Sequence, residues 1–363
     1  MSTIEDLPTP SVLVDLDVLE ANVRAMQDRA NAAGLKLRPH AKTHKSPEVG
    51  RLQLSAGASG LTLAKTSEAE VFAALGFEDI FLGYPIFGAD KARRLLALAD
   101  RMRLTVGVDS VEGAKSLGDV FHAAGRRLPV RLKIDCGYHR VGVAPEDAVE
   151  MAKRIAGLPG IAFAGVFTHG GQGYSALTPE DLAEAGHLEG RVVAAAADAI
   201  RAAGLPVGDV SLGSTPTARA GMSQRGVTET RPGTYVYNDF SQVSLGSCRL
   251  EDCAMTVVAT VVSSPAPDRA VVDAGSKTLS NDPLRPEGPG HGAILGRRSR
   301  LARLSEEHGV IGVEPGEAFA VGERVRILPN HACIVSNLHD SLVAVRKGRV
   351  EGRITVAARG CVQ

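Results

Sequence analysis

The sequence predicts an α/β protein: a (β/α)8 barrel of the TIM type followed by an antiparallel β domain. Short β-branched runs alternate eight times with amphipathic helical stretches over about 230 residues, which is typical of such a barrel. An open doubly wound sheet would need fewer strands and an early glycine-rich turn that is absent here. Beyond residue 246 the helical stretches give way to strand-like runs separated by turn signals.

The eight barrel strands are predicted at residues 35–38, 60–63, 79–82, 104–108, 130–134, 163–167, 207–212 and 233–237. Apolar residues recur at helical spacing between them, most clearly over residues 179–203. The chain therefore carries the repeated strand–helix units that a barrel requires.

The C-terminal region is predicted to form strands at residues 257–262, 270–273, 318–321, 324–327, 341–346 and 353–356. Lys347 and Gly348 separate the last two runs as a hairpin turn. Three prolines and three glycines make residues 281–292 a loop, which we regard as a candidate functional loop. We therefore expect a barrel at residues 17–245 and a β domain at 246–363. The opening strand within residues 1–16 is expected to pair with the β domain and join the two.

The composition excludes several functional classes. The 363 residues contain 41 Lys plus Arg and 41 Asp plus Glu, so no basic excess favours binding to nucleic acid. No run of about 20 apolar residues predicts a membrane span, and no secretory signal is evident at the N-terminus. The five cysteines are irregularly spaced, which favours a cytoplasmic protein without disulfides. No dinucleotide fingerprint follows a strand, which disfavours hydride transfer.

Reactive side chains gather at the predicted C-terminal ends of the barrel strands, where barrel enzymes place their active sites. The first strand ends in RPHAKTHK, residues 38–45, in which Lys42 could form an imine with an aldehyde. A solvated basic turn is an equally weighted interpretation of this run alone. After the seventh strand, the residues Gly213-Ser214-Thr215 precede a helix and could hold a phosphate. An aldehyde-trapping lysine and a phosphate site together predict pyridoxal 5'-phosphate across the barrel mouth.

At these residues the chain resembles the alanine-racemase-type (fold type III) pyridoxal-phosphate enzymes, most closely the D-threonine aldolase and D-serine dehydratase branch. The similarity rests on RPHAKT (38–43), on the Asp-x-Gly-x-x-Arg-x-Gly pattern of 135–142, on PGTY (232–235), and on tail segments such as PNHAC (329–333). It implies that Lys42 is the Schiff-base lysine. The other residues implied at the cofactor are Arg140 near its phenolic oxygen, His169 along its ring, and Gly213, Ser214, Thr215, Gly233 and Tyr235 near its phosphate.

The resemblance also implies a divalent metal, Zn²⁺ or Mn²⁺, at His331 and Cys333. The two residues are separated by one position on a strand-like stretch, so both side chains should point to one face. An imidazole and a thiolate suit Zn²⁺, although two protein ligands are fewer than usual and leave positions for water and substrate. Without the resemblance, a satisfied core histidine beside an inert buried cysteine is the more common arrangement.

The resemblance implies a homodimeric lyase that acts on a D-3-hydroxy-α-amino acid, with Lys42, His169 and His331 as catalytic candidates. The tail residues 337–340 and 357–360 favour a D-threonine aldolase, which cleaves its substrate to glycine and an aldehyde. The alternative is a D-serine or D-3-hydroxyaspartate dehydratase, which releases a keto acid and ammonia. Cys333 favours this alternative, because dehydratases of this branch show cysteine where aldolases often show aspartate. An amino-acid racemase and a non-catalytic cofactor-binding protein are further interpretations.

Overall fold

The computed structural model describes residues 2–286 and 288–363, which group into two compact units. The barrel unit comprises residues 26–42, 53–233 and 361–363, and the β unit comprises the described residues of 1–25, 43–52 and 234–360. Helices α1 (Leu16–Ala32) and α2 (Pro47–Ser55) have residues in both units. The domain ranges 17–245 and 246–363 remain predictions.

The barrel unit contains a sheet of eight described strands, all parallel to their neighbours. Their spatial order is β2 (Lys36–Leu37), β9 (Glu229–Thr230), β8 (Asp209–Leu212), β7 (Ile161–Phe167), β6 (Leu128–Lys133), β5 (Arg103–Val108), β4 (Asp79–Leu82) and β3 (Leu61–Leu63). A parallel bridge between His40 and Thr62 joins the two edges of the sheet. The predicted barrel is therefore confirmed.

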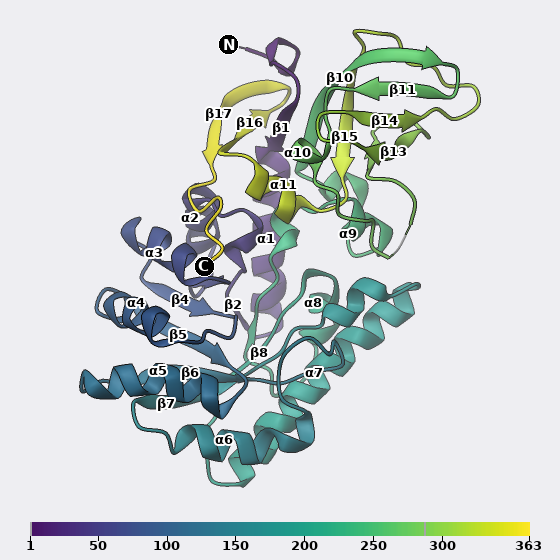
Figure 1. The fold of residues 1–363 in the computed structure, drawn as a ribbon. Coiled ribbons are helices and arrows are strands. Elements are labelled where there is room, and N and C mark those ends of the chain that lie inside the picture. Colours follow the sequence, from purple (N-terminus) through teal and green to yellow (C-terminus); the bar gives the residue numbers. More distant parts are fainter. Residues whose placement is uncertain (1, 287) are drawn as a thin grey trace. The chain divides into compact units, whose positions relative to one another are not determined.

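Helices follow the strands along the outer side of this sheet (Figure 1). They are α3 (Thr66–Ala74), α4 (Ala89–Ala99), α5 (Val111–Ala123), α6 (Ala148–Ala156), α7 (Pro179–Ala202) and α8 (Thr215–Gly221). Several start where a capping residue predicts it: the Thr178 hydroxyl accepts the Asp181 N–H, and Pro179 occupies the first helical position of α7. None of the described helices combines the length and hydrophobicity that a membrane crossing requires.

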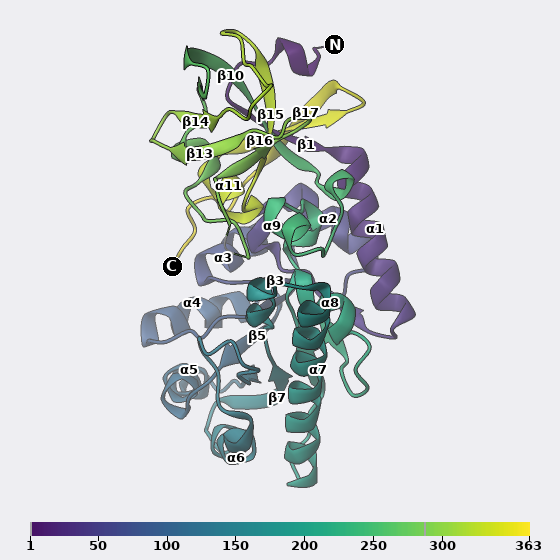
Figure 2. The same ribbon diagram turned by 90° about the vertical axis from the view of Figure 1, so that its right-hand side faces the viewer.

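The β unit contains a ring of six antiparallel strands (Figure 2). In order around the ring, they are β10 (Met255–Ala266), β11 (Arg269–Val272), β14 (Gly309–Gly312), β13 (Arg300–Leu304), β12 (Gly292–Ile294) and β15 (Arg324–Pro329), which pairs with β10 again. The predicted antiparallel C-terminal domain is therefore confirmed. Two short helices, α9 (Phe240–Ser244) and α10 (Ser276–Leu279), also lie in this unit.

The opening strand β1 (Ser11–Asp15) joins the sheet of the β unit, as expected. It runs antiparallel to β10 and parallel to β16 (Ser341–Arg346), which forms a hairpin with β17 (Arg349–Thr355). Buried Leu13, Val258 and Val343 form a small apolar cluster across these strands, which explains the position of β1. Lys347 and Gly348 both have positive φ values, 50° and 77°, as the predicted two-residue hairpin turn requires.

Some predicted elements differ from the structure. The eighth barrel strand is β9 at Glu229–Thr230, and the predicted run at 233–237 contains a 3-10 turn at Thr234–Val236. Residues 318–321 form no strand, whereas β12, β13 and β14 lie in a region for which no strand was predicted. These three strands are three to five residues long and rich in glycine and arginine, so they contain no β-branched run longer than two residues that would mark a strand in the sequence.

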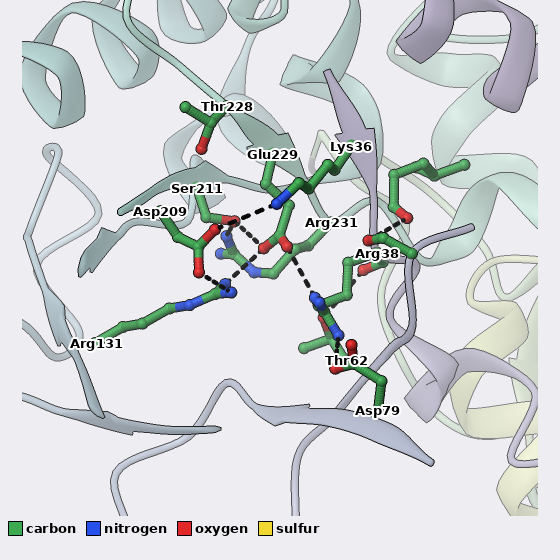
Figure 3. A network of polar contacts seen from close by, with 12 residues as sticks. Lys36, Arg38, Thr62, Asp79, Arg131, Asp209, Ser211, Thr228, Glu229 and Arg231 are labelled. Atoms are coloured by element: carbon green, nitrogen blue, oxygen red, sulfur yellow. Dashed lines mark hydrogen bonds and ion pairs between the residues drawn. The ribbon is translucent and has the colours of Figure 1, made fainter. Parts of the chain in front are cut away.

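A network of charged side chains fills part of the barrel unit (Figure 3). The Glu229 carboxylate is fully buried and accepts hydrogen bonds from Arg38 Nε (2.8 Å), Arg131 Nη1 (2.6 Å) and the Ser211 hydroxyl (2.7 Å). Burial alone would raise the pKa of Glu229. The charges of Arg131 and Arg38 outweigh this effect and lower the pKa to about 2. Asp79 and Asp209 bind the outer ends of the same two guanidinium groups. Glu229 therefore neutralises two buried cations.

We expect Glu229→Ala to lower the free energy of unfolding by about 3–5 kcal/mol, because Arg38 and Arg131 would stay buried without their shared partner. Urea denaturation measures this loss. Glu150→Ala, which removes an exposed glutamate from α6, is the control and should change the free energy of unfolding by less than about 0.5 kcal/mol. A loss below about 1 kcal/mol at Glu229 would contradict this assignment.

Ionisation of Glu229 should also make the stability of the protein depend on pH. The pKa of Glu229 is about 2 in the folded protein, below its ordinary value of 4.5. The carboxylate therefore contributes stability above a pH of about 4.5, and this contribution is lost as the pH falls toward 2. Over that window, Glu229→Gln should lose less free energy of unfolding than the unsubstituted protein.

Candidate active site

Lys42 lies in a 3-10 turn, Ala41–Thr43, just after the barrel strand β2. The next residues are buried: His44 is fully buried and Lys45 is 6% exposed. Lys45 has a positive φ of 48°, and its ammonium donates to Asn337 Oδ1 at 2.8 Å. The run is therefore an ordered, largely buried turn, and the interpretation as a solvated basic turn is wrong.

His169 follows β7, and its Nδ1 contacts the carbonyl oxygen of Gly213 at the end of β8. Removal from water and the nearby cations Lys133, Lys42 and Arg140 hold the pKa of His169 well below its ordinary value. The imidazole is therefore neutral. Since a carbonyl oxygen only accepts hydrogen bonds, Nδ1 carries the proton and Nε2 carries the lone pair.

Aromatic and cationic groups lie beside this imidazole. The Tyr138 ring meets the His169 ring edge-on, with 5.9 Å between the ring centres. The Arg140 guanidinium lies 4.8 Å from the centre of the Tyr138 ring. Arg140 is exposed, and it lies in the loop that follows β6. The ends of β6, β7 and β8 thus bring Arg140, His169 and Gly213 into one region of the barrel unit.

The turn between β8 and α8 contains a buried hydroxyl without a partner. Ser214 is 4% exposed, and its Oγ has no hydrogen-bond partner among the described residues. The adjacent Thr215 Oγ1 accepts the Gly233 N–H at 3.2 Å, which ties this turn to the segment after β9. Buried hydroxyls are normally satisfied, so this one indicates a missing acceptor such as a phosphate oxygen. The turn therefore fits the predicted phosphate group.

Gly233 is the last residue of this segment in the barrel unit, and Tyr235 belongs to the β unit, where it is 3% exposed. Six of the predicted cofactor residues therefore interact with one another within the barrel unit. They are Lys42, Arg140, His169, Gly213, Thr215 and Gly233. His331 and Cys333 belong to the β unit.

The predicted strand at His331 and Cys333 is wrong. Strand β15 ends at Pro329, and His331 is the N-cap of helix α11 (Ala332–Leu338), so Cys333 lies in the first helical turn. The Asp239 carboxylate accepts the Ala332 N–H at 3.0 Å and thereby satisfies an amide at the start of the helix. This partner is 93 residues away in the chain, so the local sequence does not reveal it.

His331 and Cys333 nevertheless lie together. The His331 side chain hydrogen-bonds to Cys333, and its Nδ1 lies 2.6 Å from Asp282 Oδ2. Burial would lower the pKa of His331, but Cys333 and the Asp282 hydrogen bond raise it well above its ordinary value. Because Asp282 holds Nδ1, release of the imidazolium proton would free the other ring nitrogen to bind a cation together with the Cys333 sulfur. A carboxylate that holds one ring nitrogen in this way is common beside metal-binding histidines.

Two threonine hydroxyls surround the Cys333 sulfur. Thr43 Oγ1 lies 3.2 Å from Sγ, and Thr234 Oγ1 lies 3.6 Å from it. Thr43 is the residue that directly follows Lys42. Within residues 2–286 and 288–363, no three His, Cys, Asp or Glu side chains are arranged to hold a metal ion. A cation at this pair would therefore need water or substrate to complete its coordination.

Asp282, Thr43 and Lys133 also lie among these groups and were not predicted from the sequence. Asp282 lies in the segment 281–292, and the proline and glycine content of that segment was the only sequence feature that pointed to a functional role. Lys133 lies at the end of β6 and is 6% exposed, with burial and Arg231 lowering its pKa to about 7. Lysine is rarely buried, so its position inside the predicted strand 130–134 could have marked Lys133 as a candidate functional residue.

Comparisons with known proteins agree with this geometry. The family model described as "Alanine racemase, N-terminal domain" matches residues 14–240, and a model for a serine dehydratase domain matches residues 254–345. The chain is 38% identical to a D-threo-3-hydroxyaspartate dehydratase of Delftia sp. (strain HT23), over 91% of this chain and 92% of that protein. It is 35% identical to a D-threonine aldolase of Arthrobacter sp., over 97% and 93% of the two chains.

Solved structures of D-threo-3-hydroxyaspartate dehydratase superpose with a TM-score of 0.91. One is a cysteine-to-alanine variant in the metal-free form, 36% identical, with 98% of this chain and 99% of that chain covered. Another is a histidine-to-alanine variant, and the two replaced residues are two positions apart in that protein. His331 and Cys333 have the same spacing here.

Proposed function

We propose that this chain is a lyase of D-3-hydroxy-α-amino acids that uses pyridoxal phosphate and a divalent metal. The chain belongs to the alanine-racemase-type family, which includes D-threonine aldolases, D-serine dehydratases, and 3-hydroxyaspartate dehydratases and aldolases. The observation that carries this proposal is the pairing of His331 with Cys333 beside Thr43, the residue that follows Lys42. The favoured reaction is elimination of water, as in a dehydratase.

Apart from Tyr235, the residues proposed to hold the cofactor belong to the barrel unit. Lys42 would bind its aldehyde, and the unpartnered Ser214 hydroxyl, with Gly213, Thr215, Gly233 and Tyr235, would hold its phosphate. When bound, pyridoxal phosphate supplies an electron sink for the bond electrons released at the substrate Cα.

The neutral His169 ring adds no positive charge to a site that already contains Lys42, Lys133 and Arg140. Its Nε2 can accept a hydrogen bond. Arg140 supplies a guanidinium donor that is fixed against the Tyr138 ring and would orient the phenolic oxygen of the cofactor.

His331 and Cys333 would hold the metal, with Asp282 orienting the imidazole. An imidazole nitrogen and a thiolate favour Zn²⁺ over harder cations such as Mn²⁺. A divalent cation there would supply a Lewis acid for the substrate's β-hydroxyl. The metal-free cysteine-to-alanine variant of the related dehydratase supports this assignment.

Elimination needs a base that removes the proton from the substrate Cα. The Lys42 amine is the group that would accept this proton. Hydroxide then leaves Cβ, and hydrolysis of the product gives a keto acid and ammonia. Cys333 favours this outcome, because the resemblance associates cysteine at this position with dehydratases.

Retro-aldol cleavage is the second candidate, in which the Cα–Cβ bond breaks to give glycine and an aldehyde. The tail residues 337–340 and 357–360 favour it, together with the 35% identity to a D-threonine aldolase. In the structure these two tail segments are tied by an ion pair between Asp340 and Arg359.

A product assay separates the candidates. Purified protein loaded with pyridoxal phosphate and Zn²⁺ is incubated with D-threo-3-hydroxyaspartate, D-serine or D-threonine, with the L-enantiomers as controls. We expect a keto acid and equimolar ammonia, and a loss of at least about tenfold in rate after chelation that added Zn²⁺ restores. Glycine with an aldehyde as the main products would establish the aldolase instead. A rate insensitive to chelation would remove the metal from the proposal, and racemisation alone would refute the lyase.

The expected homodimer and the cytoplasmic location also remain proposals. Light scattering of the purified protein tests the first, and cell fractionation tests the second.

A further inference from the structure

Helix α7 directs one buried carboxylate at the turn after β8. Glu189 is 0% exposed, and its Oε1 accepts the Gly213 N–H at 2.9 Å. Its Oε2 accepts a hydrogen bond from the Thr217 hydroxyl at 2.6 Å. Both partners lie at the β8–α8 junction, on either side of Ser214. This carboxylate has no part in the chemistry described above.

Close packing of α7 against α8 brings Glu189 to this turn (Figure 2). A Cβ atom at Gly186 would lie 2.6 Å from the Thr217 carbonyl oxygen, and a Cβ at Gly190 would lie 2.7 Å from the Gln224 side chain. A side chain at Gly186 would collide with the backbone of α8, and one at Gly190 would collide with Gln224, just beyond α8. The two glycines flank Glu189 on the helix surface that faces α8, so the helix backbone determines where the carboxylate points.

Gly213 links this carboxylate to two groups of the proposed cofactor site. Its N–H is held by Glu189, and its carbonyl oxygen accepts the His169 Nδ1–H. The next residue is Ser214, whose buried hydroxyl has no partner among the described residues. The orientation of Gly213 therefore decides both where Ser214 Oγ lies and which tautomer His169 adopts.

We propose that Glu189 is a positioning residue of the cofactor site: by holding Gly213, it keeps the Ser214 hydroxyl in place for the phosphate and keeps His169 in its Nδ1–H tautomer. This inference rests on the proposed function for the identity of the ligand, but the hold on His169 does not require the cofactor. A carboxylate that only tied α7 to α8 would contribute to stability and would influence neither property.

The test compares Glu189→Ala, Glu189→Gln and Thr217→Val with Glu184→Gln. Glu184 lies on the same helix but is exposed and pairs with Arg191, so its substitution is the matched control. Glutamine retains an oxygen that can accept the Gly213 N–H, and its amide can donate to the Thr217 hydroxyl. Thr217→Val removes one of the two hydrogen bonds and leaves the contact with Gly213.

The first measurement is the Kd for pyridoxal phosphate, by absorbance titration of the cofactor-free protein. We expect a Kd increase of about tenfold or more for Glu189→Ala, because a buried N–H loses its charged partner. Glu189→Gln and Glu184→Gln should stay within about threefold of the unsubstituted protein, and Thr217→Val should be intermediate.

The second measurement is the pair of ¹⁵N chemical shifts of the His169 ring, which distinguishes the two neutral tautomers. We expect the Nδ1–H form in the unsubstituted protein and in Glu189→Gln, and a mixture of tautomers in Glu189→Ala.

An unchanged Kd for pyridoxal phosphate and an unchanged His169 tautomer in folded Glu189→Ala would overturn the inference. If that variant does not fold, an unchanged Kd for Thr217→Val together with a Kd for Glu189→Gln raised tenfold or more would overturn it instead. Failure of the unsubstituted protein to bind pyridoxal phosphate would refute the proposed function, while the tautomer comparison would still test the hold on Gly213.

Discussion

Lys42→Ala is expected to remove the visible absorbance band of the protein loaded with pyridoxal phosphate and to lower turnover by at least about a thousandfold. The substitution removes the amine proposed to bind the cofactor covalently and to accept the Cα proton. A positioned base alone contributes about 10²–10⁴ in rate. The surrounding turn should stay folded, because Lys45 and Asn337 still hold its C-terminal end. Absorbance spectra and steady-state rates measure the two effects.

Lys115→Ala is the control for this experiment, since Lys115 lies on the surface of α5 and pairs with Asp119. It should leave the spectrum and the rate unchanged. A yellow Lys42→Ala protein would contradict the assignment and would point to Lys45 or Lys133 as the covalent anchor. Double substitutions of Lys42 with each of these lysines would then identify it.

His331→Ala and Cys333→Ala are each expected to abolish stoichiometric metal binding and to lower turnover at least about a hundredfold, while the visible band of the cofactor persists. Each substitution removes one of the two proposed protein donors, and a single donor would not hold a cation tightly. The groups proposed to bind the cofactor belong to the barrel unit, apart from Tyr235, and are untouched. Elemental analysis measures the metal, and the product assay measures the rate.

Two matched substitutions control for general damage. His122→Ala removes an exposed histidine on α5, and Cys248→Ser changes a half-buried cysteine outside the metal pair. Both should retain full metal content and rate. If His331→Ala and Cys333→Ala also retain full metal content and activity, the pair is a structural contact and the cation binds elsewhere or not at all.

Local patterns in the sequence determined the fold class and located much of the proposed cofactor site. The alternation of strands and helices predicted the barrel, because period and turn signals belong to neighbouring residues. The hairpin turn at Lys347 and Gly348 was readable for the same reason. Lys42, His169 and the turn beginning at Gly213 were found because the ends of parallel barrel strands meet at one face, so strand assignment alone places them.

Only the tertiary structure decided how these groups are held. Asp282 meets His331 across 49 positions, Glu189 meets Gly213 across 24, and Arg38 meets Glu229 across 191. Such contacts depend on strand register and on helix orientation, which no local pattern encodes. The start of α11 was missed for this reason, since the carboxylate of Asp239 that supports it comes from a distant segment. The sequence by itself thus determined which reactive groups the protein carries and on which strand ends they lie. The folded chain decided their hydrogen-bond partners, because those partners come together only when distant segments pack.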